Sequence, residues 1–296
     1  MTNILVGTTS WTEKTLLDSK RFYPSNATTS AARLRYYATQ FRIVEVDSSY
    51  YGLPAERNSL LWAERTPEGF VFDVKAFRLF TQHQTPLPVL PKDIAEALGD
   101  TKRKNLYYTD LPNEAREELW RRFRLSLEPL RKAGKLGVVL FQFPPWFVYK
   151  PSGLEYIAHC AEMLTGDQVA VEFRHRSWLN EKHADEVLAF EREHNLAHVV
   201  VDEPQGFVSS IPAVWDVTCQ SVAVVRLHGR NRQTWAKKGL STAAERFRYL
   251  YSQDELQELA PPVKSLAKEA RMVHVLFNNC YGDYAQRNAL DLGQLI

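Results

Sequence analysis

A short apolar run of the kind that forms a buried strand recurs eight times along the chain, and most segments between the runs carry helix-like patterning. Eight strands alternating with helices predict an α/β fold, namely a single (β/α)8 TIM-like barrel. The 296 residues fit such a barrel of about 250 residues plus an insertion after the third strand. In chain order the runs are Ile4–Gly7, Ile43–Val46, Phe70–Ala76, Leu136–Phe143, Val169–Phe173, Ala197–Val201, Val222–Leu227 and Val273–Phe277.

The composition fits a globular domain with a full core, since 45% of the residues are hydrophobic and 24% are charged. The formal net charge of +2 neither demands nor excludes a nucleic-acid partner. The three cysteines form no CxxC pair, which is typical of reduced thiols and predicts a cytoplasmic protein. We expect no signal peptide and no membrane partner, because no apolar run approaches the roughly 20 residues of a membrane span.

Helical periodicity marks most of the connections between the runs. Ser30–Phe41 has its apolar residues on one face, and Thr29 or Ser30 can cap its start. The helix that begins near Ser252 is expected to break at Pro261–Pro262, because proline lacks a backbone donor and clashes with the preceding turn. Further helices are predicted at Glu56–Arg65, Ser152–Leu164, Asn180–His194 and after Gly282.

The connection after the third run is long. Residues 77–133 are predicted to form an insertion and a helix over the top of the barrel, within one domain that spans residues 1–296. Gln84–Pro91 is rich in proline and must be extended or turned. Lys102–Lys104 is a short basic patch, and Asn113–Ala133 is a strongly patterned helix.

Charged residues interrupt the apolar runs near their carboxyl ends, which is the face where this fold carries its active sites. Side chains alternate along a strand, so Glu45 shares a face with Asp47, and Glu172 shares one with Arg174. An acid and a base held close in a buried site exchange protons with a substrate, which makes Glu45, Lys75 and Glu172 the candidate catalytic residues. The alternative is an ion-pair network that only fixes the register of the barrel.

The segment Arg226-Leu-His-Gly-Arg230 ends the seventh run and begins a basic loop. Loops after the seventh and eighth strands of this fold often bind phosphate, and arginine forks suit phosphate oxygens. We therefore expect Arg226, His228 and Arg230 to hold an anion. The alternative is a solvated basic loop.

Aromatic residues follow several runs and are expected in loops at the same end of the barrel. Such rings either stack on a sugar or base or close the top of the core. They are Trp11, Tyr50, Tyr51, Trp146, Trp178 and Trp235.

Metal binding requires several histidines or carboxylates that converge. The chain has no HxH or HExxH spacing, and a structural cationic network is the favoured interpretation, so no metal site and no particular cofactor is predicted. The side chains considered as ligands are Asp47, His83, Glu172, His175, Asp202 and His228.

Together these segments resemble the YecE-like family over nearly the whole chain. The resemblance rests on Val6–Trp11, Phe22–Pro24, Val44–Tyr51, Lys75 with Thr81 and His83, Gln142–Pro145, Val171–Trp178, Arg226–Arg230 and the polar run from Phe277 to Ala289. It implies a TIM-like barrel and no established reaction. The recurring polar positions of that family fall on Trp11, Glu45, Tyr50, Lys75, His83, Glu172, Arg174, Asp202, Arg226, His228, Asn278 and Asn288.

The leading hypothesis is an enzyme, a hydrolase, that acts by acid/base chemistry on a phosphate-bearing ligand. The ligand would be either a sugar phosphate or a weakly bound nucleic-acid phosphodiester. Glu172 would serve as acid or base, and Lys75 as its electrostatic partner or proton donor. The alternative is a non-catalytic barrel that binds nucleic acid or protein. The oligomeric state is left open. The predicted ligand-binding residues are Trp11, Asp47, Tyr50, His83, Arg174, Asp202, Arg226, His228, Arg230 and Asn278.

Overall fold

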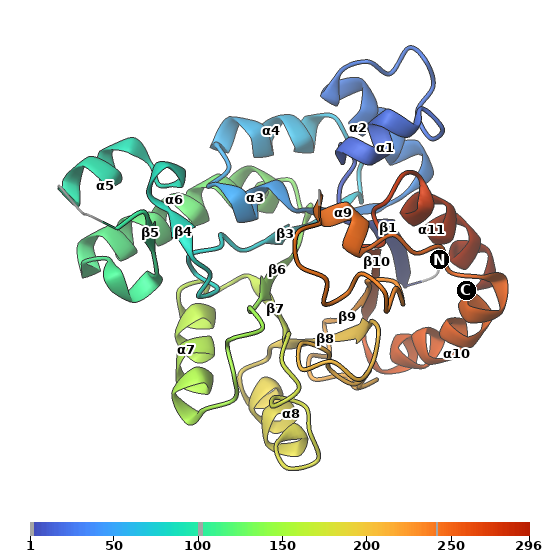
Figure 1. The fold of residues 1–296 in the computed structure, drawn as a ribbon. Coiled ribbons are helices and arrows are strands. Elements are labelled where there is room, and N and C mark those ends of the chain that lie inside the picture. The colour runs from blue at the N-terminus through green and yellow to red at the C-terminus, as the bar shows by residue number, and fades with distance from the viewer. Residues whose placement is uncertain (1–2, 100–102, 241) are drawn as a thin grey trace.

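Eight parallel strands close into a barrel, in the order β1-β10-β9-β8-β7-β6-β3-β2. The structure is a computed structural model that describes residues 3–99, 103–240 and 242–296 (Figure 1). Each of the eight predicted runs coincides with a barrel strand, so the predicted TIM-like barrel is confirmed. The strands are β1 (Ile4–Thr8), β2 (Ile43–Val46), β3 (Val71–Lys75), β6 (Leu136–Gln142), β7 (Gln168–Glu172), β8 (Ala197–Asp202), β9 (Val222–Leu227) and β10 (Met272–Phe277).

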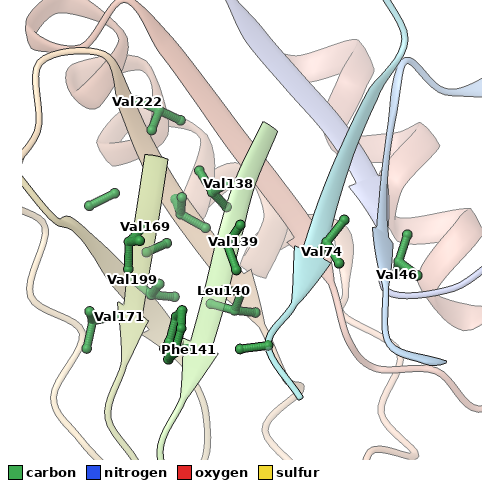
Figure 2. Packing of buried hydrophobic residues seen from close by; sticks show 14 of the residues in the cluster. Val46, Val74, Val138, Val139, Leu140, Phe141, Val169, Val171, Val199 and Val222 are labelled. Carbon is green, nitrogen blue, oxygen red and sulfur yellow. The ribbon is translucent and has the colours of Figure 1, made fainter. Parts of the chain in front are cut away.

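The strands are buried on both faces, which explains why their sequences are almost continuously apolar. Every residue of β2, β8 and β9 is buried. Figure 2 shows valine and other aliphatic side chains of neighbouring strands packed together, among them Val74, Val139 and Val171. Branched side chains pack this core closely, which gives the charged residues at the strand ends a rigid support.

Helices surround the barrel as an outer ring (Figure 1). The predicted helices are present, and the expected cap is formed, since the Thr29 side chain accepts a hydrogen bond from the Ala32 backbone N–H. Within the described ranges, no helix combines the length and apolar character that crossing a membrane would require. The helices are α1 (Lys14–Ser19), α2 (Ser30–Gln40), α3 (Ser48–Tyr51), α4 (Glu56–Glu64), α5 (Lys92–Ala97), α6 (Asn113–Lys132), α7 (Pro151–Glu162), α8 (Ala184–Glu193), α9 (Ala243–Arg246), α10 (Gln253–Glu269) and α11 (Tyr284–Leu295).

The predicted break at Pro261–Pro262 is wrong, because α10 continues through both prolines to Glu269. The carbonyl groups that lose their donors belong to Gln257 and Glu258, which are exposed and therefore open to water. The opposite face buries apolar side chains, including Leu256 and Val263. Burial of this face keeps the helix continuous where local propensity would end it.

The long connection between β3 and β6 carries a small antiparallel pair, β4 (Thr85–Pro86) with β5 (Asn105–Leu106), and the short helix α5. The long helix α6 follows and packs against α4 and β6. The ring of Trp120 on α6 stacks on Phe80 at a centroid distance of 3.7 Å, and its indole N–H donates to the Tyr108 hydroxyl. These contacts join the connection to the helix that follows it. Of the basic patch, Lys102 lies outside the described residues.

The close approach of β1 to β2 depends on Gly7. A methyl group at this position would lie 2.2 Å from the backbone carbonyl oxygen of Ile43. We expect Gly7→Ala to lower the free energy of unfolding by about 1–3 kcal/mol, the usual cost of overpacking a rigid core. The measurement is urea unfolding with unchanged m-values. Gly52→Ala is the matched control, because no atom lies within 4 Å of the added methyl group; an equal loss in both variants would contradict the explanation.

Candidate functional site

The carboxyl ends of β2, β7 and β9 bring three charged side chains together in the barrel mouth. The guanidinium of Arg226 donates to both oxygens of Glu45, with Nε to Oε2 at 2.9 Å and Nη2 to Oε1 at 2.6 Å. Its Nη1 donates to Oε2 of Glu172. All three side chains are fully buried. One cation is therefore shared between two carboxyl groups from opposite parts of the barrel.

A chain of hydrogen bonds fixes the state of His228. The hydroxyl of Thr9 donates to Oδ1 of Asn278 at 2.8 Å, which orients the amide. The Asn278 amide then donates to Nδ1 of His228 at 2.7 Å. Nδ1 is thus an acceptor, and the ring proton lies on Nε2, which donates to Oε1 of Glu172 at 3.1 Å. Burial lowers the pKa of His228 to about 3, so the imidazole is neutral at pH 7.

The surroundings move the pKa values of the two glutamates in opposite directions. Burial alone would raise the pKa of Glu172, but Arg226 and His228 outweigh it and hold this pKa well below the usual range. Arg174 adds to this effect, with Nη1 3.2 Å from Oε1 of Glu172. Burial raises the pKa of Glu45 to about 8, because Arg226 opposes the shift only in part and Asp47 reinforces it. Glu172 stays ionised, whereas Glu45 can gain or lose a proton near neutral pH.

A cavity of about 380 Å³ opens beside Glu45, between the ends of β1 and β2 and the helix α4. Trp11 lines it and is only 6% exposed, and its indole N–H has no partner among the described side chains. Ser10, also in the lining, has a φ of 139°, a strained value for a residue with a Cβ. The lining residues are Ser10, Trp11, Thr12, Ser30, Glu45, Asp47, Ser48, Asn58, Leu61, Trp62 and Arg65.

Lys75 and Glu172 were expected to pair, but each has other partners. The ammonium of Lys75 lies 3.5 Å from Oδ1 of Asp47 and 4.9 Å from the centroid of the Tyr50 ring. Glu172 instead contacts Arg226, Arg174 and His228, as described above. Spacing along the strands could not reveal this choice, because it depends on which side chains meet across the mouth. Lys75 and Asp47 form a separate pair beside the cavity.

His83 lies at the rim, against the edge of Tyr50, with ring centroids 5.1 Å apart. Its Nδ1 lies 2.8 Å from the hydroxyl of Thr81, which donates to a backbone carbonyl and therefore accepts from the imidazole. Burial, helped by the charge of Lys75, lowers the pKa of His83 to about 3. His83 is thus a neutral imidazole near the Lys75–Asp47 pair.

Arg226 and Arg230, the two arginines expected to hold an anion, already have carboxylate partners. Nε and Nη2 of Arg230 donate to Asp202, and Nη1 donates to Glu255 at 3.2 Å. The Tyr251 hydroxyl also donates to Asp202, at 2.7 Å. Arg226 is engaged in the same way by Glu45 and Glu172. Anion binding by Arg226, His228 and Arg230 stays a prediction, and it would require these partners to be exchanged.

Glu203 and Trp235 complete the far side of the mouth. Glu203 was missed from the sequence, although it directly follows Asp202 at the end of a strand. Its Oε2 lies 3.2 Å from Nη1 of Arg174, and its Oε1 accepts a hydrogen bond from the backbone N–H of Ile211. Burial raises the pKa of Glu203 to about 7, although Arg174 opposes the shift. The guanidinium of Arg174 also lies over the ring of Trp235, 4.8 Å from its centroid.

The predicted rim aromatics include both buried and exposed rings. Trp178 is fully buried and stacks on Phe173 and Phe147, so it closes the core. Tyr51 and Trp146 are exposed. No three histidine, cysteine, aspartate or glutamate side chains converge as metal ligands do in residues 3–99, 103–240 and 242–296. The imidazole of His175 bonds to Ser177 in its own loop.

We expect Glu172→Gln to lower the free energy of unfolding by about 3–5 kcal/mol, because it removes the one fully buried carboxylate that Arg226 and Arg174 share. Urea unfolding at pH 7 measures this loss. Glu155→Gln, on the exposed face of α7, serves as the control and should change stability by less than about 0.5 kcal/mol. A loss below about 1.5 kcal/mol for Glu172→Gln would mean that water reaches and compensates the site.

Comparison with known proteins gives the same architecture and one family. The profile described as "Protein of unknown function DUF72" matches residues 5–296. UPF0759 protein YunF of Bacillus subtilis (strain 168) is 34% identical over 295 residues, covering 99% of this chain and 94% of that protein. A DUF72 family protein of Thermotoga maritima MSB8 is 31% identical with a TM-score of 0.75, covering 99% of this chain and 98% of that one. A DUF72 family protein of Enterococcus faecalis V583 is 27% identical with a TM-score of 0.79, covering 99% and 94%. The chain described here belongs to the DUF72 family.

Proposed function

We propose that this protein is an enzyme that performs acid/base chemistry on a small phosphate-bearing ligand, with a sugar phosphate as the preferred class. The observation that carries the proposal is Glu45, a fully buried carboxyl group with a pKa near 8 that lines an open cavity. A general acid or base works best when its pKa lies close to the working pH. Few structural carboxyl groups meet that condition, since most keep a pKa near 4.

Glu45 and Glu172 take separate roles in this proposal. Glu45 donates or accepts the proton, because it is the one of the two glutamates that belongs to the lining of the cavity. Glu172 stays ionised and holds Arg226 in place, so the guanidinium remains bidentate on Glu45. Lys75, paired with Asp47 beside the cavity, supplies a positive charge near the reacting group. This division follows from pKa values that the environment moves in opposite directions.

The size and lining of the cavity support a small hydroxyl-bearing ligand. About 380 Å³ lies at the lower end of the range for small-molecule pockets. Hydroxyl, amide and carboxyl groups in its lining can form hydrogen bonds with the hydroxyl groups of a sugar. Trp11 and Trp62 contribute apolar surface to the wall of the cavity. A nucleic-acid phosphodiester would need a longer groove with unpaired cations. The proposal also includes membership of the YecE-like family and a cytoplasmic location.

The titration of Glu45 makes a specific prediction about stability. Its folded pKa of about 8 exceeds the ordinary value of 4.5. The folded protein therefore retains this proton longer than the unfolded chain, and the contribution of Glu45 is fully present below pH 4.5 and lost as pH rises through 8. We expect the free energy of unfolding of the wild type, relative to Glu45→Gln, to fall by up to about 1.4 kcal/mol per pH unit in that window. Urea unfolding between pH 5 and 9 measures it.

The exposed Glu64 on α4 gives the matched control for this titration. Glu64→Gln should track the wild type at every pH, because this exposed side chain lies outside the buried network around Arg226. A constant difference between the wild type and Glu45→Gln across the window would show that Glu45 stays ionised. The proposed acid/base role would then fail.

Turnover provides the second test. We expect the wild type, incubated in D2O with a panel of aldose and ketose phosphates, to exchange carbon-bound hydrogen or form product detectable by NMR. Glu45→Gln should slow the reaction by about 10²- to 10⁴-fold, the usual contribution of a positioned acid or base. Glu64→Gln should react like the wild type. A Glu45→Gln variant that reacts at the wild-type rate would remove Glu45 from the chemistry. Binding of DNA or protein without any reaction would favour the non-catalytic alternative.

A further inference from the structure

We propose that Arg65 holds the anionic group of the ligand in the cavity beside Glu45. This inference rests on the proposed function, because it names the residue that selects a phosphate-bearing ligand at the same site. Arg65 was not among the residues singled out from the sequence. It follows α4 directly, and its backbone N–H donates to the Leu61 carbonyl at 3.2 Å.

The first argument is the availability of the charge. The guanidiniums of Arg226 and Arg230 are taken up by carboxylates, and Lys75 pairs with Asp47. Arg65 is half-buried and lines the cavity, yet its guanidinium has no carboxylate or hydrogen-bond partner within the part of the chain that the structure describes. A planar fork of five N–H donors therefore borders the cavity with its hydrogen-bonding capacity unused.

The second argument is what surrounds Arg65 in the same cavity. The indole N–H of the buried Trp11 lacks a partner, so the cavity wall holds a second donor that a ligand can satisfy. Ser30 is the first residue of α2, an eleven-residue helix, and its place in the lining puts the positive end of that helix at the cavity. The lining that contains Arg65 thus holds a second donor and a helix N-terminus.

The third argument is the distribution of acids. Glu45 and Asp47 belong to β2 and the residue after it, whereas Arg65 lies at the far end of α4, so acid and cation enter the lining from different elements. A ligand with an anionic group at one end and hydroxyl groups at the other matches this polarity. Its anionic group would take the Arg65 fork, and a hydroxyl or a carbon-bound proton would face Glu45. A neutral sugar would leave the guanidinium unsatisfied.

Binding of inorganic phosphate tests the inference, measured by calorimetry and by the phosphate-dependent rise in melting temperature, with chloride keeping ionic strength constant. We expect the wild type to bind phosphate and Arg65→Gln to bind it about 10- to 100-fold more weakly, as the loss of a charged hydrogen-bond pair predicts. Arg57→Gln is the matched control, since Arg57 is an exposed arginine on the same helix; it should bind like the wild type.

Two further variants keep the test decisive. Arg65→Lys retains the charge without the bidentate fork and should bind with intermediate affinity, which also covers the case in which Arg65→Gln fails to fold. If Arg230→Gln, rather than Arg65→Gln, abolishes binding, the anion lies on the loop after β9 and the inference is wrong. No phosphate binding by the wild type would also overturn it. Neither result would alter the Glu45 titration, which tests the proposed function separately.

Discussion

The shared guanidinium of Arg226 is the interaction on which the barrel mouth depends. It joins Glu45 on β2 to Glu172 on β7 from a position on β9, and so spans the interior instead of linking neighbouring strands. Such a buried group is costly unless every donor is used. Arg226 largely meets that requirement, because four of its five N–H groups donate to Glu45, Glu172 and the amide oxygen of Gln142, the last at 3.4 Å. The strand ends are therefore held in one arrangement before any ligand enters.

Sharing one cation between two acids also gives the mouth its chemical asymmetry. Glu172 has two arginines and an imidazole N–H around it, whereas Glu45 has one arginine and a neighbouring carboxylate. Two residues of the same type thus differ in protonation state because of position alone. The neutral state of His228 belongs to the same balance, since a charged imidazole would add a third cation to one side.

The sequence predicted the strands well because a buried parallel strand leaves a contiguous apolar run, and the charged residues near the carboxyl ends of these runs pointed to Glu45 and Glu172. The sequence could not predict which charged residues pair, since Lys75 could contact either Glu172 or Asp47. In the folded barrel it contacts Asp47. The carboxylates around Arg230 come from β8 and α10, far away in the chain. Arg65 carried no signal at all, because it closes an ordinary amphipathic helix.

The two prolines of α10 bear on the order in which the barrel assembles. Each proline costs a helix about 3 kcal/mol in isolation, and a short helix is already marginal in water. The segment therefore has little tendency to become helical by itself. It gains its stability from apolar contacts with β9, β10 and α11. Formation of α10 is therefore coupled to its docking on β9, β10 and α11, the elements that supply those contacts.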